Sequence, residues 1–206
     1  MYLVKTPLFA QWLFKKLVWR IVNTEKVFLT FDDGPVPEAT PWVLDILKNE
    51  GIKATFFCVG ENVVKYPEIY QRIIAEGHSI GNHTFNHLNA WKTDNKSYLS
   101  NVEKASKIID TKLFRPPYGK LSPSLTKKLE EDYDIIMWDV LSGDFDSNIS
   151  AEKCLDNVEK NAKEGSIIVF HDSVKAIDKL KYVLPEVIKV FKEKGMRFDK
   201  IRTKVR

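Results

Sequence analysis

The 206-residue chain is predicted to form a single α/β domain, a distorted (β/α)7 barrel with mostly parallel strands. From Lys26 onward, seven short apolar runs alternate with longer amphipathic stretches. Strands that are separated each time by a helix need crossover connections, so they run parallel. Polar residues follow nearly every apolar run, as at the strand ends of a barrel, whereas an open doubly wound sheet would gather them at one switch point. No linker or repeat divides the chain.

The predicted elements follow in order along the chain. The strands are Val27–Phe31, Ala54–Val59, Ser79–Asn82, Leu113–Arg115, Ile135–Asp139, Ile167–His171 and Arg197–Ile201. The first helix begins at Thr40-Pro41, an N-cap and a proline in the first helical position, and Gly51 closes it. Pro67 opens the second helix and Gly77 closes it. The later helices are Lys96–Asp110, Ser122–Glu131, Ser150–Lys163 and Ile177–Lys194.

Residues 1–25 are predicted to be an N-terminal arm or amphipathic helix packed on the barrel, and residues 26–206 to be the barrel domain. One helical face would carry Leu13, Leu17, Val18 and Ile21, and the opposite face Gln11, Lys15, Lys16 and Arg20. Such a helix could lie on a membrane as a peripheral contact. A segment covering the bottom of the domain is the favoured interpretation, because buried amphipathic segments are commoner. The interrupting basic residues argue against a signal peptide and a transmembrane helix, so a cytoplasmic location is expected.

Composition excludes several classes of protein. Hydrophobic residues make up 44% and charged residues 29% of the chain, which is ordinary globular composition rather than disorder or coiled coil. The net charge of +4 is mild and spread along the chain, so no nucleic-acid partner is expected. Cys58 and Cys154 lie in apolar segments without metal-site spacing, and we expect buried reduced thiols.

The strongest local signal is the run Thr30-Phe31-Asp32-Asp33-Gly34-Pro35, in which two adjacent carboxylates end a strand. At a strand end the turn lets both side chains project from the top of the barrel, where two acids can take different roles. Taken alone, the same residues also suit an ordinary turn, since Asp, Gly and Pro all favour turns.

Two histidines, His83 and His87, are spaced four residues apart, which on a helical turn places both on one face. With Asp33 they would form a set of two imidazoles and a carboxylate that can hold a divalent ion and leave positions open for water and substrate. His78 has no such company and is expected to be structural.

Two further strand ends carry candidate residues. Arg115 precedes the rigid run Pro116-Pro117-Tyr118-Gly119, which could hold the Tyr118 backbone amide towards a developing oxyanion or could be a polyproline surface turn. His171 ends a buried strand and is a general-acid candidate. The adjacent Asp172 is expected to cap the following turn.

Together these segments resemble the five ordered motifs of the polysaccharide deacetylases, known as carbohydrate esterase family 4 or the NodB homology domain. The matching segments are Thr30–Pro35, His83–His87, Arg115–Gly119, Leu141–Phe145 and Val169–His171. The similarity spans roughly residues 26 to 200, and the ordered combination is specific although each motif alone is weak.

The resemblance implies a metal-dependent hydrolase that removes N-acetyl groups from amino sugars in polysaccharides or oligosaccharides. Asp32 would be the catalytic base and Arg115 would orient it. Asp33, His83 and His87 would bind a divalent metal, foremost Zn2+ with Co2+, Ni2+ and Mn2+ as alternatives. The Tyr118 amide would help hold the oxyanion.

The resemblance further implies that His171 is the catalytic acid, paired with Asp144. The fourth motif departs from the family pattern of Asp-x-x-Asp-Trp, because Leu141 stands for the first Asp and Phe145 for the Trp. Asp144 is kept, so acid catalysis is retained, while the two replacements change the groove wall and could shift substrate choice.

Two alternatives stay open. A metal-dependent amidohydrolase acting on a non-sugar acylamide would use the same parts. A barrel that only binds glycan, without activity, is disfavoured because the base and all the metal-ligand positions are present. The expected partner is an N-acetylated glycan such as a chitooligosaccharide or a peptidoglycan fragment. The sequence leaves open the substrate, the native metal, the oligomeric state and the role of residues 1–25.

Overall fold

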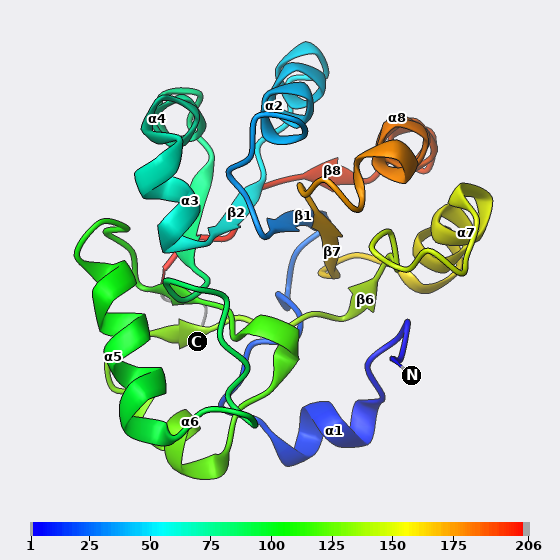
Figure 1. The fold of residues 1–206 in the computed structure, drawn as a ribbon. Helices are drawn as coiled ribbons and strands as arrows, with labels where there is room; N and C mark the ends of the chain where they lie inside the picture. Colours follow the sequence, from blue (N-terminus) through cyan, green and yellow to red (C-terminus); the bar gives the residue numbers. More distant parts are fainter. Residues whose placement is uncertain (1, 204–206) are drawn as a thin grey trace.

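The strands curl into a half-barrel that is surrounded by helices, in a computed structural model that describes residues 2–203 (Figure 1). The hydrogen-bonded strand order is β5-β4-β3-β2-β1-β7-β6, and β8 pairs with β1 off this path. Every pairing between these strands is parallel, as predicted. The strands are β1 (Lys26–Asp32), β2 (Thr55–Cys58), β3 (Ser79–Asn82), β4 (Leu113–Phe114), β5 (Asp134–Ile135), β6 (Val140–Leu141), β7 (Ile167–His171) and β8 (Arg197–Phe198).

Helices connect successive strands on the outside of the sheet (Figure 1). They are α1 (Leu8–Leu13), α2 (Thr40–Asn49), α3 (Gly60–Lys65), α4 (Pro67–Ala75), α5 (Asn95–Ser106), the short 3-10 helix η1 (Pro117–Gly119), α6 (Pro123–Leu129), α7 (Ala151–Asn161) and α8 (Ile177–Glu193). Helices α2 and α4 to α8 correspond to the six predicted helices, and α3 is an additional turn that the sequence pattern did not reveal.

The predicted strand Ile135–Asp139 is largely wrong, because only Ile135 lies in a strand, and two short strands, β5 and β6, flank residues 136–139. Strand β5 ends at Ile135 beside β4, and β6 begins at Val140 beside β7, at the opposite edge of the sheet. The intervening residues cross the gap between these two edges. An apolar run satisfies either arrangement, so periodicity alone does not distinguish one strand from two.

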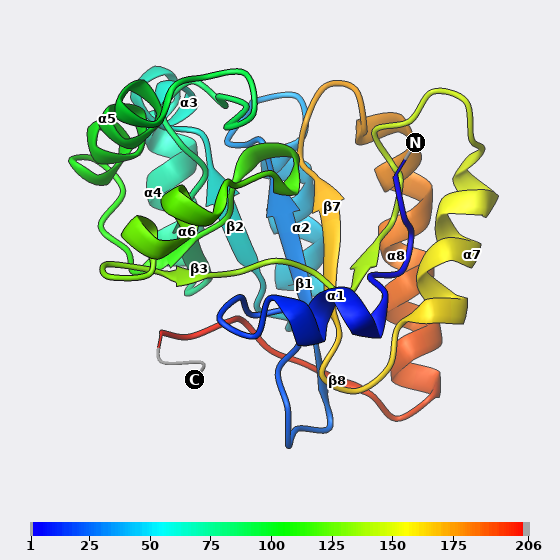
Figure 2. The same cartoon turned by 90° about the horizontal axis from the view of Figure 1, so that it is seen from below.

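The N-terminal arm fills the gap between β5 and β6 (Figure 2). Lys5 pairs antiparallel with Val140 of β6, and Val18 pairs in parallel with Ile136, next to β5. The Val18 amide donates to the Ile135 carbonyl at 2.9 Å, and the Met137 amide donates to the Val18 carbonyl at 2.8 Å. The arm therefore supplies hydrogen-bond partners to both edges of the sheet.

The helix expected from the spacing of Leu13, Leu17, Val18 and Ile21 does not form, because the helical part of the arm is α1, which ends at Leu13. The backbone groups of Val18 are used in pairing with the sheet, which is incompatible with a helix through this residue. None of the residues of α1 is buried. No helix within residues 2–203 has the length and apolar character needed to cross a bilayer.

The core lies between the sheet and its surrounding helices. Phe31 of β1 stacks between Phe56 of β2 and Phe170 of β7, with ring centroids 5.1 and 5.9 Å apart. Cys58 and Cys154 are free and buried, which confirms the expectation of reduced thiols. This packing fixes neighbouring strands in register, so their carboxyl ends are held side by side.

Candidate active site

The carboxyl ends of β1, β3, β4 and β7 bring the expected site residues together at one end of the barrel. Asp32 is the last residue of β1, and it is the register partner of His171, the last residue of β7. His83 follows β3 and Arg115 follows β4 directly. Because parallel strands end at the same edge of the sheet, the carboxylate, the guanidinium and the two imidazole rings of these residues lie around one position.

Asp32 and Arg115 form a buried ion pair. The Arg115 Nη1 donates to Asp32 Oδ1 at 2.7 Å, and the same nitrogen lies 2.7 Å from Thr30 Oγ1. The Arg115 side chain is fully enclosed, and Asp32 is only 4% exposed. Asp32 Oδ2 has no protein donor within the described residues, so it remains available to a substrate or a water molecule.

Arg115 is held rigidly by the barrel interior. Its Nε donates to the Ile136 carbonyl at 3.2 Å and its Nη2 to the Met137 carbonyl at 2.9 Å. The guanidinium carbon lies 4.0 Å from the centre of the Phe57 ring, a cation–π contact. Burial lowers the pKa of Arg115, and the charge of Asp32 opposes this. A guanidinium fixed at three positions orients the carboxylate it binds.

Asp33, His83 and His87 form a cluster whose ligand atoms all lie within 4.8 Å of one another. Asp33 Oδ1 is 3.8 Å from Nε2 of His83 and 3.1 Å from Nε2 of His87. One carboxylate and two imidazoles are a common ligand set for a divalent transition metal. The structure thus brings together the three residues that the sequence singled out.

The hydrogen bonding of His83 suits it to metal binding. Its Nδ1 lies 2.7 Å from the Arg115 carbonyl, which only accepts, so Nδ1 carries the proton and Nε2 has the free lone pair. Burial lowers the pKa of His83 to about 4, so the ring is neutral at physiological pH. A neutral imidazole with its second nitrogen bound to a carbonyl is the form that binds a metal.

The carboxylate of Asp33 is kept ionised by its neighbours. Burial alone would raise the pKa of Asp33, but the contact with His87 and the charges of His171 and His83 hold it well below its usual range. The backbone of Asp33 lies in the left-handed region with φ of 82°, and the Asn62 side chain donates to its carbonyl at 2.8 Å. This turn lets the two adjacent carboxylates meet different partners, Asp32 the guanidinium of Arg115 and Asp33 the imidazole rings.

The segment from His83 to His87 is an irregular bend, so the expected helical turn is wrong although the proximity of the rings is right. Thr84 and His87 have positive φ values of 63° and 54°, and the two imidazole centroids lie 5.1 Å apart. The Asn101 Oδ1 accepts from the backbone amides of Phe85 and Asn86 at 2.8 and 3.0 Å. Tertiary hydrogen bonds to α5, rather than helical spacing, hold the bend.

The turn after Arg115 exposes a free amide. Tyr118 has φ of 61° and ψ of 7°, and its side chain is 58% exposed, with its ring 4.8 Å from that of His87. Within the described part of the chain, the Tyr118 amide has no acceptor, whereas the next amide, Gly119, donates to Pro116. An unpaired amide beside the cluster is suited to bind an anionic oxygen.

His171 and Asp144 are doubly hydrogen bonded. Asp144 Oδ1 lies 2.8 Å from the ring Nδ1 of His171, and Asp144 Oδ2 accepts from the His171 backbone amide at 2.7 Å. Burial alone would lower the pKa of His171, but the charge and the hydrogen bond of Asp144 raise it to about 9. At neutral pH the ring is therefore a charged proton donor whose Nε2 remains available.

Sequence reasoning misjudged Asp172, which does not cap its own turn. Its carboxyl group is buried and accepts from the Gly34 amide at 3.1 Å and from the Thr40 hydroxyl at 2.6 Å. Burial raises the pKa of Asp172 to about 8. The side chain thus ties the turn after Asp33 to the start of α2, a long-range role that no local pattern reveals.

The sequence also gave no sign that the N-terminal arm reaches this site. The Tyr2 ring lies 5.1 Å from that of Phe145, which contacts His171 edge to face at 4.9 Å. Tyr2 Oη donates to Asp146 Oδ2 at 3.0 Å. Phe145 therefore packs against His171, the proposed acid, and Tyr2 of the arm packs against Phe145.

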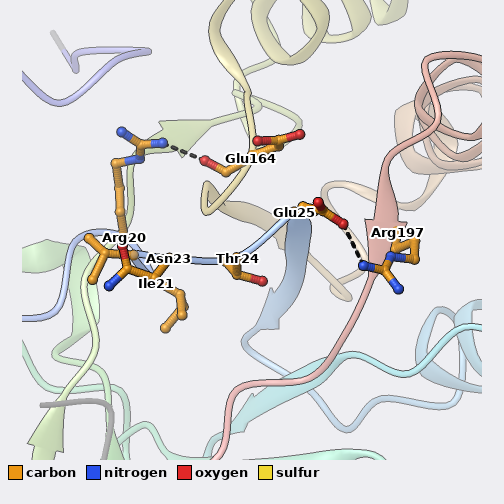
Figure 3. Close-up of a pocket in the computed structure, with 8 residues that line it drawn as sticks. Arg20, Ile21, Asn23, Thr24, Glu25, Glu164 and Arg197 are labelled. Carbon is orange, nitrogen blue, oxygen red and sulfur yellow. Dashed lines mark hydrogen bonds and ion pairs between the residues drawn. The ribbon is translucent and has the colours of Figure 1, made fainter.

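Two features lie apart from the cluster. His78 is buried, and its Nδ1 accepts from the Ala54 amide at 3.1 Å, as expected of a structural residue. A hollow of 720 Å³ lies at the amino end of β1, the end of the strand away from Asp32 (Figure 3). Three of its charged side chains are already paired, since Arg20 lies 3.3 Å from Asp139 and donates to the Glu164 carbonyl, and Arg197 binds Glu25 at 2.6 Å.

Comparison with known proteins gives related sequences over most of the chain. A family model described as polysaccharide deacetylase matches residues 20–134. The chain is 39% identical to a peptidoglycan-N-acetylglucosamine deacetylase of Bacillus cereus, over 85% of this chain and 66% of that protein. It is 32% identical to a chitooligosaccharide deacetylase of Azorhizobium caulinodans, over 73% of this chain and 75% of that protein. It spans 33% of the deacetylase PgdA of Listeria monocytogenes.

Solved structures are similar along nearly the full chain. The Bc1960 peptidoglycan N-acetylglucosamine deacetylase, solved in complex with 4-naphthalen-1-yl-N-oxidanyl-benzamide, superposes with a TM-score of 0.82 at 36% identity, covering 95% of both chains. The peptidoglycan deacetylase PdaC of Bacillus subtilis superposes with a TM-score of 0.77 at 31% identity, covering 87% of this chain and 89% of that one. The half-barrel described above is the fold of these structures.

Proposed function

The chain belongs to the polysaccharide deacetylase family, and on that premise we propose how its site removes an N-acetyl group from an amino sugar. The overall reaction is hydrolysis, in which water and an acetamide give acetate and a free amine. The observation that carries the proposal is the arrangement around the cluster of Asp33, His83 and His87, with the Asp32–Arg115 pair and the His171–Asp144 pair at neighbouring strand ends. We assign this catalytic domain to residues 26–206 and the packed arm to residues 1–25.

Asp33, His83 and His87 would hold the divalent metal of the enzyme. The set fits such an ion, because Asp33 is ionised and both Nε2 atoms lie near its Oδ1. A metal bound there would polarise the acetamide carbonyl and make a water molecule more acidic. Two nitrogen donors and one carboxylate favour Zn2+, with Co2+, Ni2+ and Mn2+ as alternatives.

Asp32 would act as the general base. Arg115 occupies its Oδ1 and leaves Oδ2 to take the proton from the attacking water. Because Arg115 is bound to two backbone carbonyls as well, the carboxylate is held in one orientation before substrate arrives. Such preorganisation lowers the cost of reaching the transition state.

The Tyr118 amide would stabilise the oxyanion that forms as the carbonyl carbon becomes tetrahedral. Tyr118 has a left-handed backbone conformation, and its amide makes no local hydrogen bond, in contrast to the neighbouring Gly119 amide. A donor that is already in place costs no reorganisation during the reaction.

His171 would donate the proton that the departing amine needs. Its pKa of about 9 keeps the ring protonated at neutral pH, and Asp144 fixes Nδ1 so that Nε2 delivers the proton. When the C–N bond breaks, the amine leaves as a neutral group carrying this proton. The water proton resides on Asp32 at that point.

The finer substrate choice is also a proposal. We infer an N-acetylated glycan of the peptidoglycan or chitooligosaccharide type, because relatives with these named activities match most of the chain. Phe145 stands where the family pattern has Trp and contacts the His171 ring, whereas Leu141, which replaces an Asp, is only 6% exposed. The smaller ring of Phe145 beside the acid would influence which sugar is accepted.

One assay separates these proposals from their alternatives. Purified enzyme loaded with Zn2+ is incubated with chitooligosaccharides, peptidoglycan fragments, N-acetylglucosamine and a simple non-sugar acetamide, and released acetate is measured. Release from the glycans alone supports the proposal. Release only from the non-sugar acetamide indicates a different amidohydrolase, and glycan binding without any release indicates an inactive barrel.

A further inference from the structure

We propose that the N-terminal arm carries a membrane-binding face that docks the enzyme on an anionic lipid bilayer. The face consists of Leu8, Phe9, Trp12, Leu13 and Phe14, whose exposed fractions are 74, 72, 68, 63 and 47%. These are five of the thirteen large apolar side chains that are exposed within residues 2–203. Such clustering within seven residues is unusual for a solvated surface and indicates an interaction site.

The membrane-binding face is presented by a fixed segment rather than by a frayed end. Before α1, the Thr6 amide donates to the Asp139 carbonyl at 3.0 Å, and the Thr6 hydroxyl donates to the Trp138 carbonyl at 2.8 Å. After α1, Val18 pairs with the edge of the sheet. The arm is thus bound to the barrel on both sides of α1, yet it turns these apolar side chains to solvent. A segment that served only to cover the barrel would bury them.

The charge of the arm matches an anionic surface. Residues 1–25 contain four basic residues and one acidic residue, Glu25, so the arm carries a net charge of +3. Lys5 and Arg20 are paired with Asp139 of the barrel. Lys15 and Lys16 are exposed directly after the apolar residues. Lys16 is paired with Glu130, whereas Lys15 lies over the Trp12 ring at 5.0 Å. Aromatic side chains beside lysines are typical of the interface between lipid headgroups and acyl chains.

A second copy of the chain is a poorer occupant for this face. In a two-fold dimer both copies use the same surface, so the exposed lysines of each copy would border an interface to which the arm contributes no carboxylate before Glu25. Like charges placed opposite each other disfavour association. Anionic headgroups would instead neutralise these lysines while the apolar side chains enter the interface.

The apolar surface continues from α1 towards the active site. A groove of 440 Å³ is lined by Leu13 and Phe14 of the arm and by Pro116, Gly119 and Leu121 of the loop that carries the free amide. An apolar groove thus connects the membrane-binding face with this loop, while α1 itself lies near the amino end of β1 (Figure 2). The docking itself is independent of the reaction and is tested without any activity measurement.

The test uses the full chain and vesicles of stated composition. Sedimentation with vesicles of phosphatidylcholine and phosphatidylglycerol in a 7:3 ratio is compared with sedimentation with phosphatidylcholine alone, at low and at high salt. We expect binding to the anionic vesicles that weakens with salt, because the headgroup attraction is screened. The double variant Phe9→Ser/Trp12→Ser should raise the apparent Kd by about tenfold or more, equal to at least ~1.4 kcal/mol.

Matched variants serve as controls. Val64→Ser/Tyr182→Ser removes two exposed apolar side chains from α3 and α8 and should bind like the original chain. Lys15→Glu should weaken binding, while Lys48→Glu on α2 should not. Circular dichroism and Tm verify that each variant is folded. The proposal is overturned if the original chain does not bind anionic vesicles, if the Phe9/Trp12 variant binds equally well, or if light scattering shows a dimer that this variant abolishes.

Discussion

The carboxylate of Asp144 accepts two hydrogen bonds from His171, one from the ring Nδ1 at 2.8 Å and one from the backbone amide at 2.7 Å. The bond from the backbone amide holds the Asp144 carboxylate at the end of β7. The backbone of His171 therefore positions the same carboxylate that binds its ring. Because Asp144 is fully buried, its charge acts on the imidazole with little screening by solvent.

Asp144→Asn should lower the pH at which activity is lost on the alkaline side. The pKa of His171 is about 9 because Asp144 more than offsets burial, and the amide removes that charge. The alkaline limb of kcat/KM should therefore move from near pH 9 to a lower pH. Asp146→Asn, two residues further on, is the control. An unmoved limb in Asp144→Asn would show that Asp144 does not tune the acid.

The same pair should make stability depend on pH. A histidine whose pKa is raised on folding stabilises the native state fully below its ordinary pKa of about 6.5, and this contribution is lost as the pH rises through about 9. The difference in unfolding free energy between the original chain and Asp144→Asn should be largest below pH 6.5 and should shrink towards pH 9 and above. Urea titrations at several pH values measure it, and a constant difference would contradict the assignment.

His83→Ala or His87→Ala should remove the metal. The purified enzyme is expected to hold about one divalent ion per chain, bound by the two Nε2 atoms and Asp33. His78→Ala is the matched control, because this buried histidine lies outside the cluster and should leave the metal content unchanged. Elemental analysis after dialysis gives the result, and retention of the ion in the double variant His83→Ala/His87→Ala would refute the site.

Asp32→Asn should reduce turnover roughly 10²- to 10⁴-fold while the metal content stays the same, since only the base is lost. The amide oxygen can still accept from Arg115, but the buried guanidinium loses its counter-charge, so the variant is less stable and circular dichroism is used to verify that it is folded. Acetate release and metal content are measured on the same sample. Activity equal to that of the original chain would exclude Asp32 as the base.

Arg115→Met should destabilise the fold by about 3–5 kcal/mol, because it leaves the buried Asp32 without its cation. Arg197→Met removes an ion pair with Glu25 in which both side chains are mostly exposed, and it should change stability little. Urea denaturation compares the two variants. Equal effects would mean that the buried pair contributes no more than a surface pair.

Much of the site could be predicted because its residues lie at strand ends, where the apolar pattern stops abruptly. Asp32, Arg115 and His171 each end or follow a buried run, and parallel strands bring such ends to one level. The order of these motifs along the chain also sufficed to indicate the family.

The backbone between the strands could not be predicted in the same way. Asp33, Thr84, His87 and Tyr118 all have positive φ values, although none of them is glycine. Glycine adopts that conformation freely, whereas Asp and His adopt it only occasionally and Thr and Tyr rarely, so tertiary contacts decide where such residues take it. The hydrogen bonds that the backbone amides of Phe85 and Asn86 donate to Asn101 Oδ1 are such contacts, formed between residues far apart in sequence.

The arm was the least predictable part. Its spacing of apolar residues fits a helix through Val18, but Val18 pairs with Ile136, and this pairing depends on a gap in the sheet that only the folded barrel contains. Asp139 is a further example, because its buried carboxylate binds Lys5 at 2.7 Å and Ser166 at 2.6 Å. Nothing near Asp139 in the sequence points to either partner.

The pairing of Lys5 with Val140 and of Val18 with Ile136 also bears on how the protein avoids aggregation. Unpaired strand edges act as templates for strands of other molecules. In this barrel the two edges that face the gap are occupied by the chain's own arm, which thus serves as a built-in edge protector. A chain shortened to begin at Lys26 would present both edges to solvent. We expect such a chain to form edge-to-edge oligomers whose size increases with protein concentration.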